Sequence, residues 1–394
     1  MKISEVRLFK LTGRAEGDWT FGEARSVGPL DFYEEFRLRG GGRGRAEGPV
    51  TIESVYVEIA TDDGPSGLYG PILPEQAFVI ATKLRPMLLG RDPLAGEVLW
   101  DQMARGDRHA RGGLMMMAIS AVDCALWDLR GKHFGVPVYR LLGGPVRARV
   151  PAYASMLGHS LAPAEVRGRA KQFADLGFPA QKWFFRHGPG SGSAGRRENL
   201  QLAETLRQAV GDGAELMFDC WMGWDLPYSI EMSRELMKYG PKWLEEPLPP
   251  GHLAGFVSLK RQTGIPLAAG EHLYTRWEVK GFLDAAALDY VQADPDWTGG
   301  ITELIKICDL AAAYDVPVVP HGHNVHAALH VIASRPPHVC PMAEYLVKHL
   351  PRQQFFFRRQ IVPRDGSIEL PDEPGLGIEI DEAKIVQRQE LNWP

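Results

Sequence analysis

Five acidic or imidazole side chains recur at nearly equal spacing in the second half of the chain. Each follows a short apolar run, and neighbours lie 23 to 27 residues apart: Asp219, Glu245, Glu271, Asp294 and His321. An interval of this length holds one strand, one helix and two loops. The carboxyl ends of parallel strands meet on one rim of a barrel, so we expect these side chains to converge there.

The first three members of this series are carboxylates. Carboxylate clusters suit hard divalent cations, above all Mg²⁺, whereas transition metals more often recruit histidine or cysteine. Glu246 adjoins Glu245, and because side chains alternate along a strand, only one of the two should face the barrel interior. We therefore predict a Mg²⁺ site formed by Asp219, Glu245 and Glu271, with Glu246 pointing outward.

The last two members suggest a catalytic pair. Histidine is a suitable general base near neutral pH. A carboxylate behind it fixes the tautomer of the imidazole and stabilises the imidazolium. His321 lies between Pro320 and Gly322, and a glycine lets a ligand approach closely. We predict that His321 and Asp294 form a dyad on neighbouring strands.

A zinc site is the competing interpretation of the histidines. His321 and His323 resemble the H-x-H pair of zinc hydrolase barrels, but in those families the pair lies on the first barrel strand, and here it follows the seventh. His326 and His330 share one helical face, as a zinc pair would. No glutamate follows His326 in the H-E-x-x-H manner, so zinc is the less favoured reading.

The elements that must position these residues begin near residue 148. Short apolar runs alternate there with amphipathic stretches, which indicates a parallel sheet with helices. Eight such units favour a closed barrel over an open doubly wound sheet, since no G-x-G-x-x-G follows the first strand. The expected strands are 150–154, 180–185, 215–218, 242–244, 266–268, 290–292, 316–319 and 339–342.

The first part of the chain has a different texture. Residues 1–60 begin and end with strand-like runs on either side of a polar, glycine-rich loop around 40–45, and 75–142 is helical in pattern. We expect an α/β protein of three parts. They are an N-terminal α+β capping domain (1–142), a barrel (143–354), and a C-terminal segment (355–394) that packs back on the cap.

Bulk composition narrows the class of protein. The 394 residues are 45% hydrophobic and 24% charged, with a net charge of -5, so we expect a folded enzyme-sized chain and no nucleic-acid partner. The N-terminus has no apolar signal region, and the longest apolar run, 114–122, is too short to cross a membrane. Four scattered cysteines indicate a reducing compartment. We expect a cytoplasmic protein without a membrane partner.

The site segments, taken together, resemble a known family. They are Ile119 to Leu129, Leu141 to Gly144, Phe218 to Met222, Lys242 to Glu246, Gly270 to His272, Trp297 to Gly300 and Val319 to Gly322. They are similar to the enolase superfamily, in its mandelate racemase/muconate lactonising branch, over nearly the whole length. Within that branch the likeness is greatest to the L-rhamnonate dehydratase group. The resemblance implies a modified (β/α)7β barrel under a cap.

The resemblance also assigns roles. It implies Mg²⁺ as the cofactor, held by the three carboxylates, and the His321–Asp294 pair as the catalytic dyad. It adds Glu344, at the end of the expected eighth strand, as a residue that binds or orients the substrate. The remaining expected substrate contacts are His272, Arg186 and His187, and the cap-loop residues Arg25 and Tyr33. The family further implies a homo-oligomer.

Two departures from the family pattern bear on the reaction. Many relatives carry K-x-K after the second barrel strand, but here Phe184 replaces the second lysine of Lys182-Trp183-Phe184. L-rhamnonate dehydratases lack that lysine too. Lys182 either contacts the substrate carboxylate or reaches solvent. The dehydratases also carry a histidine in the first cap loop, whereas residues 16–36 offer Trp19, Arg25 and Tyr33 instead.

We therefore expect an acid-sugar dehydratase that removes the proton next to a sugar acid's carboxylate and eliminates the 3-hydroxyl to give a 2-keto-3-deoxy acid. Three alternatives stay open at this point. The first is the same reaction on another aldonate or an aldarate. The second is a racemase or epimerase with Lys182 as the other base. The third is a catalytically silent binding or scaffold protein.

Overall fold

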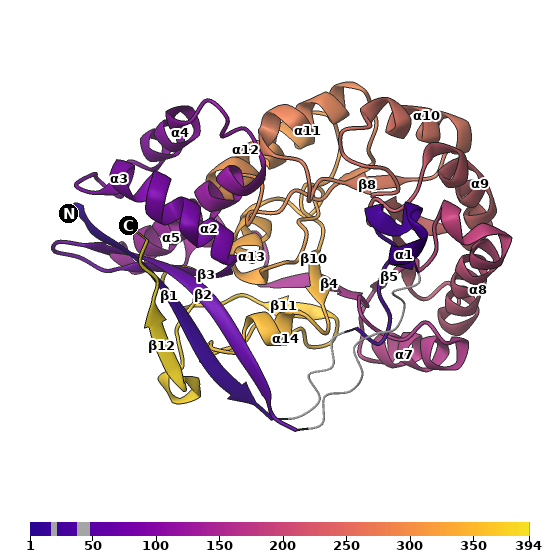
Figure 1. Cartoon of the computed structure of the whole chain (residues 1–394), viewed down its shortest axis with the longest axis horizontal. Coiled ribbons are helices and arrows are strands. Elements are labelled where there is room, and N and C mark those ends of the chain that lie inside the picture. The colour runs from indigo at the N-terminus through magenta and orange to yellow at the C-terminus, as the bar shows by residue number, and fades with distance from the viewer. Residues whose placement is uncertain (17–21, 38–47, 394) are drawn as a thin grey trace.

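The computed structural model describes residues 1–16, 22–37 and 48–393. Trp19 and the glycine-rich loop at 40–45 lie outside these residues. Figure 1 shows two bodies side by side, an antiparallel sheet with helices and a curled parallel sheet ringed by helices. We call the first the cap (β1 to β3, β12 and the helices between residues 74 and 141) and the second the barrel (β4 to β10 with their helices).

The cap is built on a four-stranded antiparallel sheet in the order β12-β1-β2-β3. Apolar residues on the core face of β1 and β2 are buried against the helices, as an alternating pattern requires. The last strand brings the end of the chain back beside its beginning, with Phe9 opposite Glu390. The cap elements are β1 (Ile3–Ala15), β2 (Val50–Thr61), β3 (Gly67–Ile72), α2 (Pro74–Val79), α3 (Arg85–Leu88), α4 (Gly96–Gly106), α5 (Gly113–His133), α6 (Val138–Leu141) and β12 (Gln387–Glu390).

The barrel sheet is parallel and runs β10-β4-β5-β6-β7-β8-β9, with the short β11 (Ser367–Glu369) antiparallel to β4. Its strands are short and buried on both faces, which explains their nearly continuous apolar sequences. The α/β class, the barrel architecture and the separate cap are thereby confirmed. The strands are β4 (Arg149–Ser155), β5 (Ala180–Phe184), β6 (Glu215–Asp219), β7 (Pro241–Glu245), β8 (Leu267–Ala269), β9 (Tyr290–Val291) and β10 (Ala343–Leu346).

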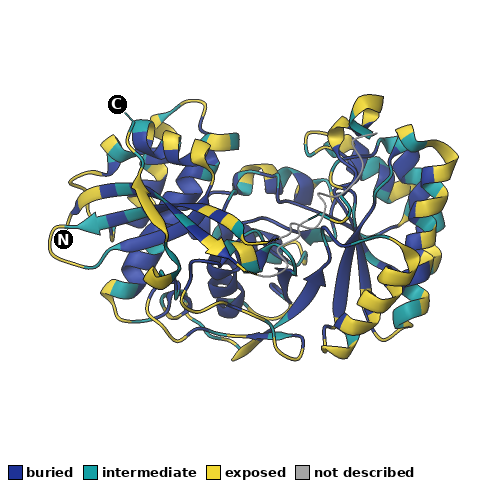
Figure 2. Cartoon of the chain, turned by 60° about the horizontal axis from the view of Figure 1, so that its bottom comes forward, coloured by how far each residue is buried: buried dark blue, intermediate teal, exposed yellow. Residues whose placement is uncertain are grey.

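Side chains fill the inside of the barrel, and helices cover its outside. The interior cluster is Tyr153, Ala180, Met217, Trp243, Ala268, Val319 and Met342, so the barrel is a packed core with its polar groups at one end. In Figure 2 the outer faces of the helices are exposed and the strands are buried. The helices are α7 (Pro163–Asp175), α8 (Gly192–Val210), α9 (Leu226–Leu236), α10 (Leu253–Thr263), α11 (Thr275–Asp284), α12 (Gly300–Ala312), α13 (Val325–Ser334) and α14 (Leu350–Gln353).

Two expected strands are wrong in detail. The run 316–319 forms no strand but a single bridge, between Val318 and Val291, although the Val319 N–H still donates to the Val291 carbonyl. The run 339–342 is not a strand either, because the Val339 and Cys340 N–H groups donate to Pro336 in a turn. The last barrel strand begins at Ala343 instead.

The cap contacts the barrel through several elements. Helix α5 packs against α12, and the segment with a short 3-10 turn (Pro29–Phe32) and α1 (Glu34–Arg37) extends away from the cap and lies over the barrel near α8. The Val27 N–H donates to the Phe185 carbonyl just beyond β5. All four cysteines are buried and free. No helix among the described residues is long and apolar enough to cross a membrane.

Candidate active site

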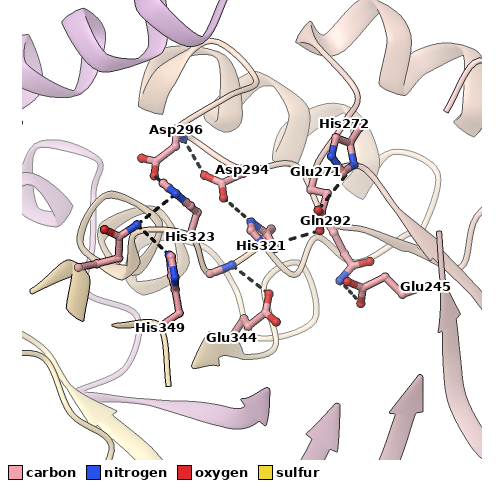
Figure 3. Close-up of polar contacts among 12 residues, drawn as sticks. Glu245, Glu271, His272, Gln292, Asp294, Asp296, His321, His323, Glu344 and His349 are labelled. Atoms are coloured by element: carbon pink, nitrogen blue, oxygen red, sulfur yellow. Dashed lines mark hydrogen bonds and ion pairs between the residues drawn. The ribbon is translucent and has the colours of Figure 1, made fainter. Parts of the chain in front are cut away.

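The residues predicted from spacing lie at the carboxyl ends of consecutive barrel strands. Asp219 and Glu245 are the last residues of β6 and β7. Glu271 and Asp294 follow β8 and β9 within three residues, and His321 follows the bridged run after α12. Figure 3 shows Asp294, His321 and Glu271 in a row. The regular interval along the sequence therefore does bring these side chains to one rim.

His321 and Asp294 form a buried hydrogen-bonded pair. The His321 Nδ1 atom lies 2.7 Å from Asp294 Oδ2, and the His321 Nε2 atom lies 3.6 Å from Glu271 Oε2. The Trp297 ring stacks on the imidazole at a centroid distance of 4.9 Å. Burial lowers the pKa of His321, but the negative charges of Glu271 and Asp294 outweigh this effect and raise the pKa well above its ordinary value while the carboxylates hold no cation. A cation held by Glu271 would offset that charge, lower the pKa again and leave Nε2 free to act as a base.

Lys182 reaches into the carboxylate cluster. Its ammonium group pairs with Glu245, lies 2.9 Å from Glu344 Oε1, and lies 3.7 Å from Asp219 Oδ2. The residue is only 3% exposed, so the interpretation of Lys182 as a strand lysine reaching solvent is wrong. Burial lowers the pKa of Lys182, but Glu245 and Glu344 raise it well above its usual range. At neutral pH it is a fixed cation of the site.

The carboxylates carry more negative charge than Lys182 can balance. Burial, with the neighbouring carboxylates, raises the pKa of Asp219 to about 6 and the pKa values of Glu245 and Glu271 to about 7. Glu344 shows the opposite: burial raises its pKa, but the adjacent Lys182 lowers it to about 2. Buried carboxylate oxygens lacking a cation are costly. Asp219, Glu245 and Glu271 carry the oxygen donors that Mg²⁺ prefers, so the chemistry of these residues fits that ion. In the metal-free site both Glu245 oxygens accept from other side chains, one from Lys182 and the other from Trp243 and Gln292.

Glu246 does not point outward as the alternation rule predicted. It is 2% exposed, and its Oε2 atom lies 2.7 Å from His272 Nδ1. Glu246, Glu271 and His272 offer ligand atoms that all lie within 4.8 Å of one another. The rule fails because β7 ends at Glu245 and Glu246 has a φ of 38°, which turns its side chain back toward the cluster. His272 thus lies at the site, with its pKa raised to about 9, since Glu246 outweighs burial.

Glu344 and Gln292 are two further polar residues that contact the site. Glu344 is the second residue of β10 and does not end the strand as expected, because the strand begins later than predicted. Its Oε2 atom accepts the Gly322 N–H at 3.0 Å. Gln292 Nε2 donates to Glu245 Oε2 at 2.7 Å. The sequence analysis does not single out Gln292, which follows directly on β9 (Tyr290–Val291); alternation along a strand could not have identified it.

Two of the remaining expected substrate contacts, Arg25 and Arg186, bind to other residues of the protein. Arg25 makes two hydrogen bonds to the Asp31 carboxylate, at 2.9 and 2.7 Å. Arg186 donates to the Arg37 carbonyl at 2.9 Å. These contacts hold the 25–37 segment over the barrel mouth.

Two further expected contacts are not brought to the cluster. Tyr33 is 59% exposed. His187 pairs with Glu198 of α8 at 2.8 Å. Among the described residues, neither side chain bonds to Lys182 or to the carboxylates around it.

A capped α/β barrel with a buried carboxylate cluster and a histidine–aspartate pair at its carboxyl rim defines a class of enzyme folds. Residues 165–384 match the family model described as enolase C-terminal domain-like. Residues 49–143 match the N-terminal domain of mandelate racemase/muconate lactonizing enzyme. The chain belongs to this branch of the enolase superfamily.

Individual relatives cover nearly the whole chain. An L-rhamnonate dehydratase of Saccharopolyspora erythraea is 34% identical, over 97% of this chain and 97% of its own. The structure of rhamnonate dehydratase from Gibberella zeae complexed with Mg superposes with a TM-score of 0.83 at 30% identity, covering 97% and 95% of the two chains. The structure of a racemase from Streptomyces coelicolor with bound magnesium superposes with a TM-score of 0.79 at 29% sequence identity, covering 97% of this chain and 98% of its own.

Proposed function

We propose that the protein is a Mg²⁺-dependent acid-sugar dehydratase, with L-rhamnonate as its first candidate substrate. The observation that carries the proposal is the His321–Asp294 pair, whose free edge faces the carboxylate cluster at 3.6 Å from Glu271. A base in that position can reach a carbon whose carboxylate is held at the cluster. Full-length similarity to L-rhamnonate dehydratase supports the choice of substrate class.

The residues divide the work as follows. Asp219, Glu245 and Glu271 would hold Mg²⁺, which when bound supplies positive charge opposite the substrate carboxylate and makes the neighbouring C–H bond more acidic. His321 Nε2 takes the proton from carbon 2, and Asp294 stabilises the imidazolium. The same imidazolium returns the proton to the 3-hydroxyl, which leaves as water. The enol product tautomerises to a 2-keto-3-deoxy acid.

The contacts of Lys182 speak against the racemase alternative. A racemase needs a base on each face of the reacting carbon, and Lys182 is the second base that this alternative requires. Its ammonium group is paired with Glu245 and Glu344, so it holds its proton. Phe184, where many relatives have a second lysine, is buried and has no titratable group.

The proposal is tested by measuring keto-acid formation from a panel of aldonates and aldarates, beginning with L-rhamnonate, with Mg²⁺ and with EDTA. We expect product only with Mg²⁺ and none from a His321→Asn variant. Near-normal turnover by that variant would contradict the mechanism. Deuterium incorporation at carbon 2 of recovered substrate, without keto acid, would instead identify a racemase or epimerase. Product from another acid sugar alone would change the substrate and keep the reaction.

A further inference from the structure

Two adjacent residues of the cap strand β3 hold both loops that carry the dyad. The Tyr69 hydroxyl donates to Asp296 Oδ1, two residues beyond Asp294. Asn324, three residues beyond His321, donates its side-chain N–H to the Gly70 carbonyl at 3.0 Å. The cap therefore contacts the dyad loops from outside the barrel.

Asp296 connects Tyr69 to the dyad. Its main-chain N–H donates to Asp294 Oδ1 at 2.7 Å, so one oxygen of Asp294 is held by the turn while the other accepts the His321 N–H. The second Asp296 oxygen lies 2.7 Å from His323 Nδ1. Figure 3 shows the two histidine–aspartate pairs next to each other. Tyr69, Asp296, Asp294 and His321 thus form one continuous hydrogen-bonded chain.

Tyr69, Asp296 and Asp294 are all buried. Buried polar atoms almost always have a hydrogen-bond partner, and such partners fix the orientation of a side chain. Asp296 receives the Tyr69 hydroxyl on one oxygen and the His323 ring N–H on the other. Removing the hydroxyl leaves the first oxygen without that donor. We expect the carboxylate then to rotate and the turn that orients Asp294 to move with it.

We propose that Tyr69 is a positioning residue for the dyad and acts through Asp296. The inference rests on the proposed function in assigning His321 as the base. It adds that the cap sets the alignment of that base, in addition to covering the barrel mouth. Tyr69 touches none of the reacting atoms, so its loss should change the rate of the chemical step and leave substrate binding nearly intact.

The first test compares Tyr69→Phe with the wild-type chain. We expect kcat to fall by about 10- to 100-fold, as a small misplacement of a catalytic group does, with KM nearly unchanged. The matched control is Tyr56→Phe on the neighbouring strand β2, whose ring packs against Phe9 and Phe357. An equal loss of kcat in both variants, or a loss confined to KM, would overturn the proposal.

A double-variant cycle tests the route through Asp296. If Tyr69 acts on the dyad through Asp296, then Tyr69→Phe combined with Asp296→Asn should lose no more kcat than the more impaired single variant. Multiplicative losses would mean that the two residues act independently, and the proposed route would be wrong.

Crystal structures of the wild-type and Tyr69→Phe chains give a readout that needs no substrate. We expect the Asp296 and Asp294 carboxylates to rotate in the variant and the His321–Asp294 contact to lengthen. Unchanged dyad geometry would refute the positioning role even if turnover falls. A wild-type chain that turns over no acid sugar would refute the proposed function, while this comparison would still decide how the cap acts on the pair.

Discussion

The Nδ1 atom of His321 lies 2.7 Å from Asp294 Oδ2. Since a carboxylate only accepts, Nδ1 must carry the proton, and Nε2 of the neutral ring is the atom that can act as a base. In Asp294→Asn the amide can donate to Nδ1 and select the other tautomer. We expect kcat to fall on the order of 10³- to 10⁴-fold, measured as keto-acid formation, with Mg²⁺ affinity retained.

The matched control for this variant is Asp309→Asn on α12, an exposed carboxylate whose contact is Arg335 at 3.4 Å. It makes the same chemical change away from the site and should leave kcat unaltered. A loss in Asp294→Asn no larger than in the control would show that the dyad does not set the rate.

Mg²⁺ affinity should depend on pH. Burial and mutual repulsion raise the pKa values of Glu245 and Glu271 to about 7 and the pKa of Asp219 to about 6. The ion binds ionised carboxylates, so it must displace protons below about pH 7. We expect the affinity to fall as pH drops from about 7 to 5.5, by about tenfold per pH unit for each proton displaced. Calorimetry in buffers of different ionisation enthalpy measures the Mg²⁺ affinity and the number of protons that the ion displaces. An affinity that does not change with pH would contradict the raised pKa values.

The raised pKa values of these three carboxylates also determine how the stability of the folded chain changes with pH. Because the folded pKa values lie above the ordinary ones, the folded metal-free chain binds these protons more tightly than the unfolded chain does. That contribution to stability is present in acid and is lost as pH rises through 6 to 7. The increase in Tm caused by Mg²⁺ should therefore grow between about pH 5.5 and 8.

A buried aspartate of the cap should hold the cap to the barrel. Asp123 of α5 accepts the Thr302 hydroxyl at 2.6 Å and the Thr302 N–H at 2.9 Å, at the start of α12. Asp123→Ala leaves both buried donors unpaired, so we expect a loss of about 3 kcal/mol in the free energy of unfolding by urea. The exposed pair of Asp101 and Arg105 provides the control, since Asp101→Ala should cost below about 0.5 kcal/mol. Equal urea midpoints for the Asp123→Ala and Asp101→Ala variants would show that Asp123 does not hold the cap to the barrel.

The fold was predictable where the pattern of hydrophobic residues reports it. Strands buried on both faces appear as apolar runs, and an acidic or imidazole residue follows five of the eight runs, so the barrel and its rim are recognisable from spacing. The last strand was placed too early because Val339 and Cys340 are as apolar as a strand requires. Their N–H groups are used in a turn, and no hydrophobic pattern records where a backbone group donates.

The site was predictable in its residue types but not in its contacts. Glu246 was assigned outward by alternation, which holds only inside a strand. The burial of Lys182 among carboxylates depends on three strands far apart in the sequence, and Tyr69 reaches Asp296 from another sheet. Such contacts follow from the packing of the cap on the barrel, which local sequence does not encode.

Lys182 offers the sharpest test of the charge balance at the site. Lys182→Met keeps the length of the side chain and removes the cation that pairs with Glu245 and Glu344. Breaking a buried pair by removing one partner costs about 3 to 5 kcal/mol, so we expect the free energy of unfolding of the metal-free chain to fall by this amount at about pH 8.

The control is Lys242→Met, which breaks a surface pair with Glu215 at 2.7 Å and should cost below about 1 kcal/mol. Mg²⁺ should restore part of the loss in the Lys182 variant and none in the control, because only the first leaves buried carboxylates without a cation. Equal unfolding midpoints for the two variants would show that Lys182 is not needed to balance the cluster.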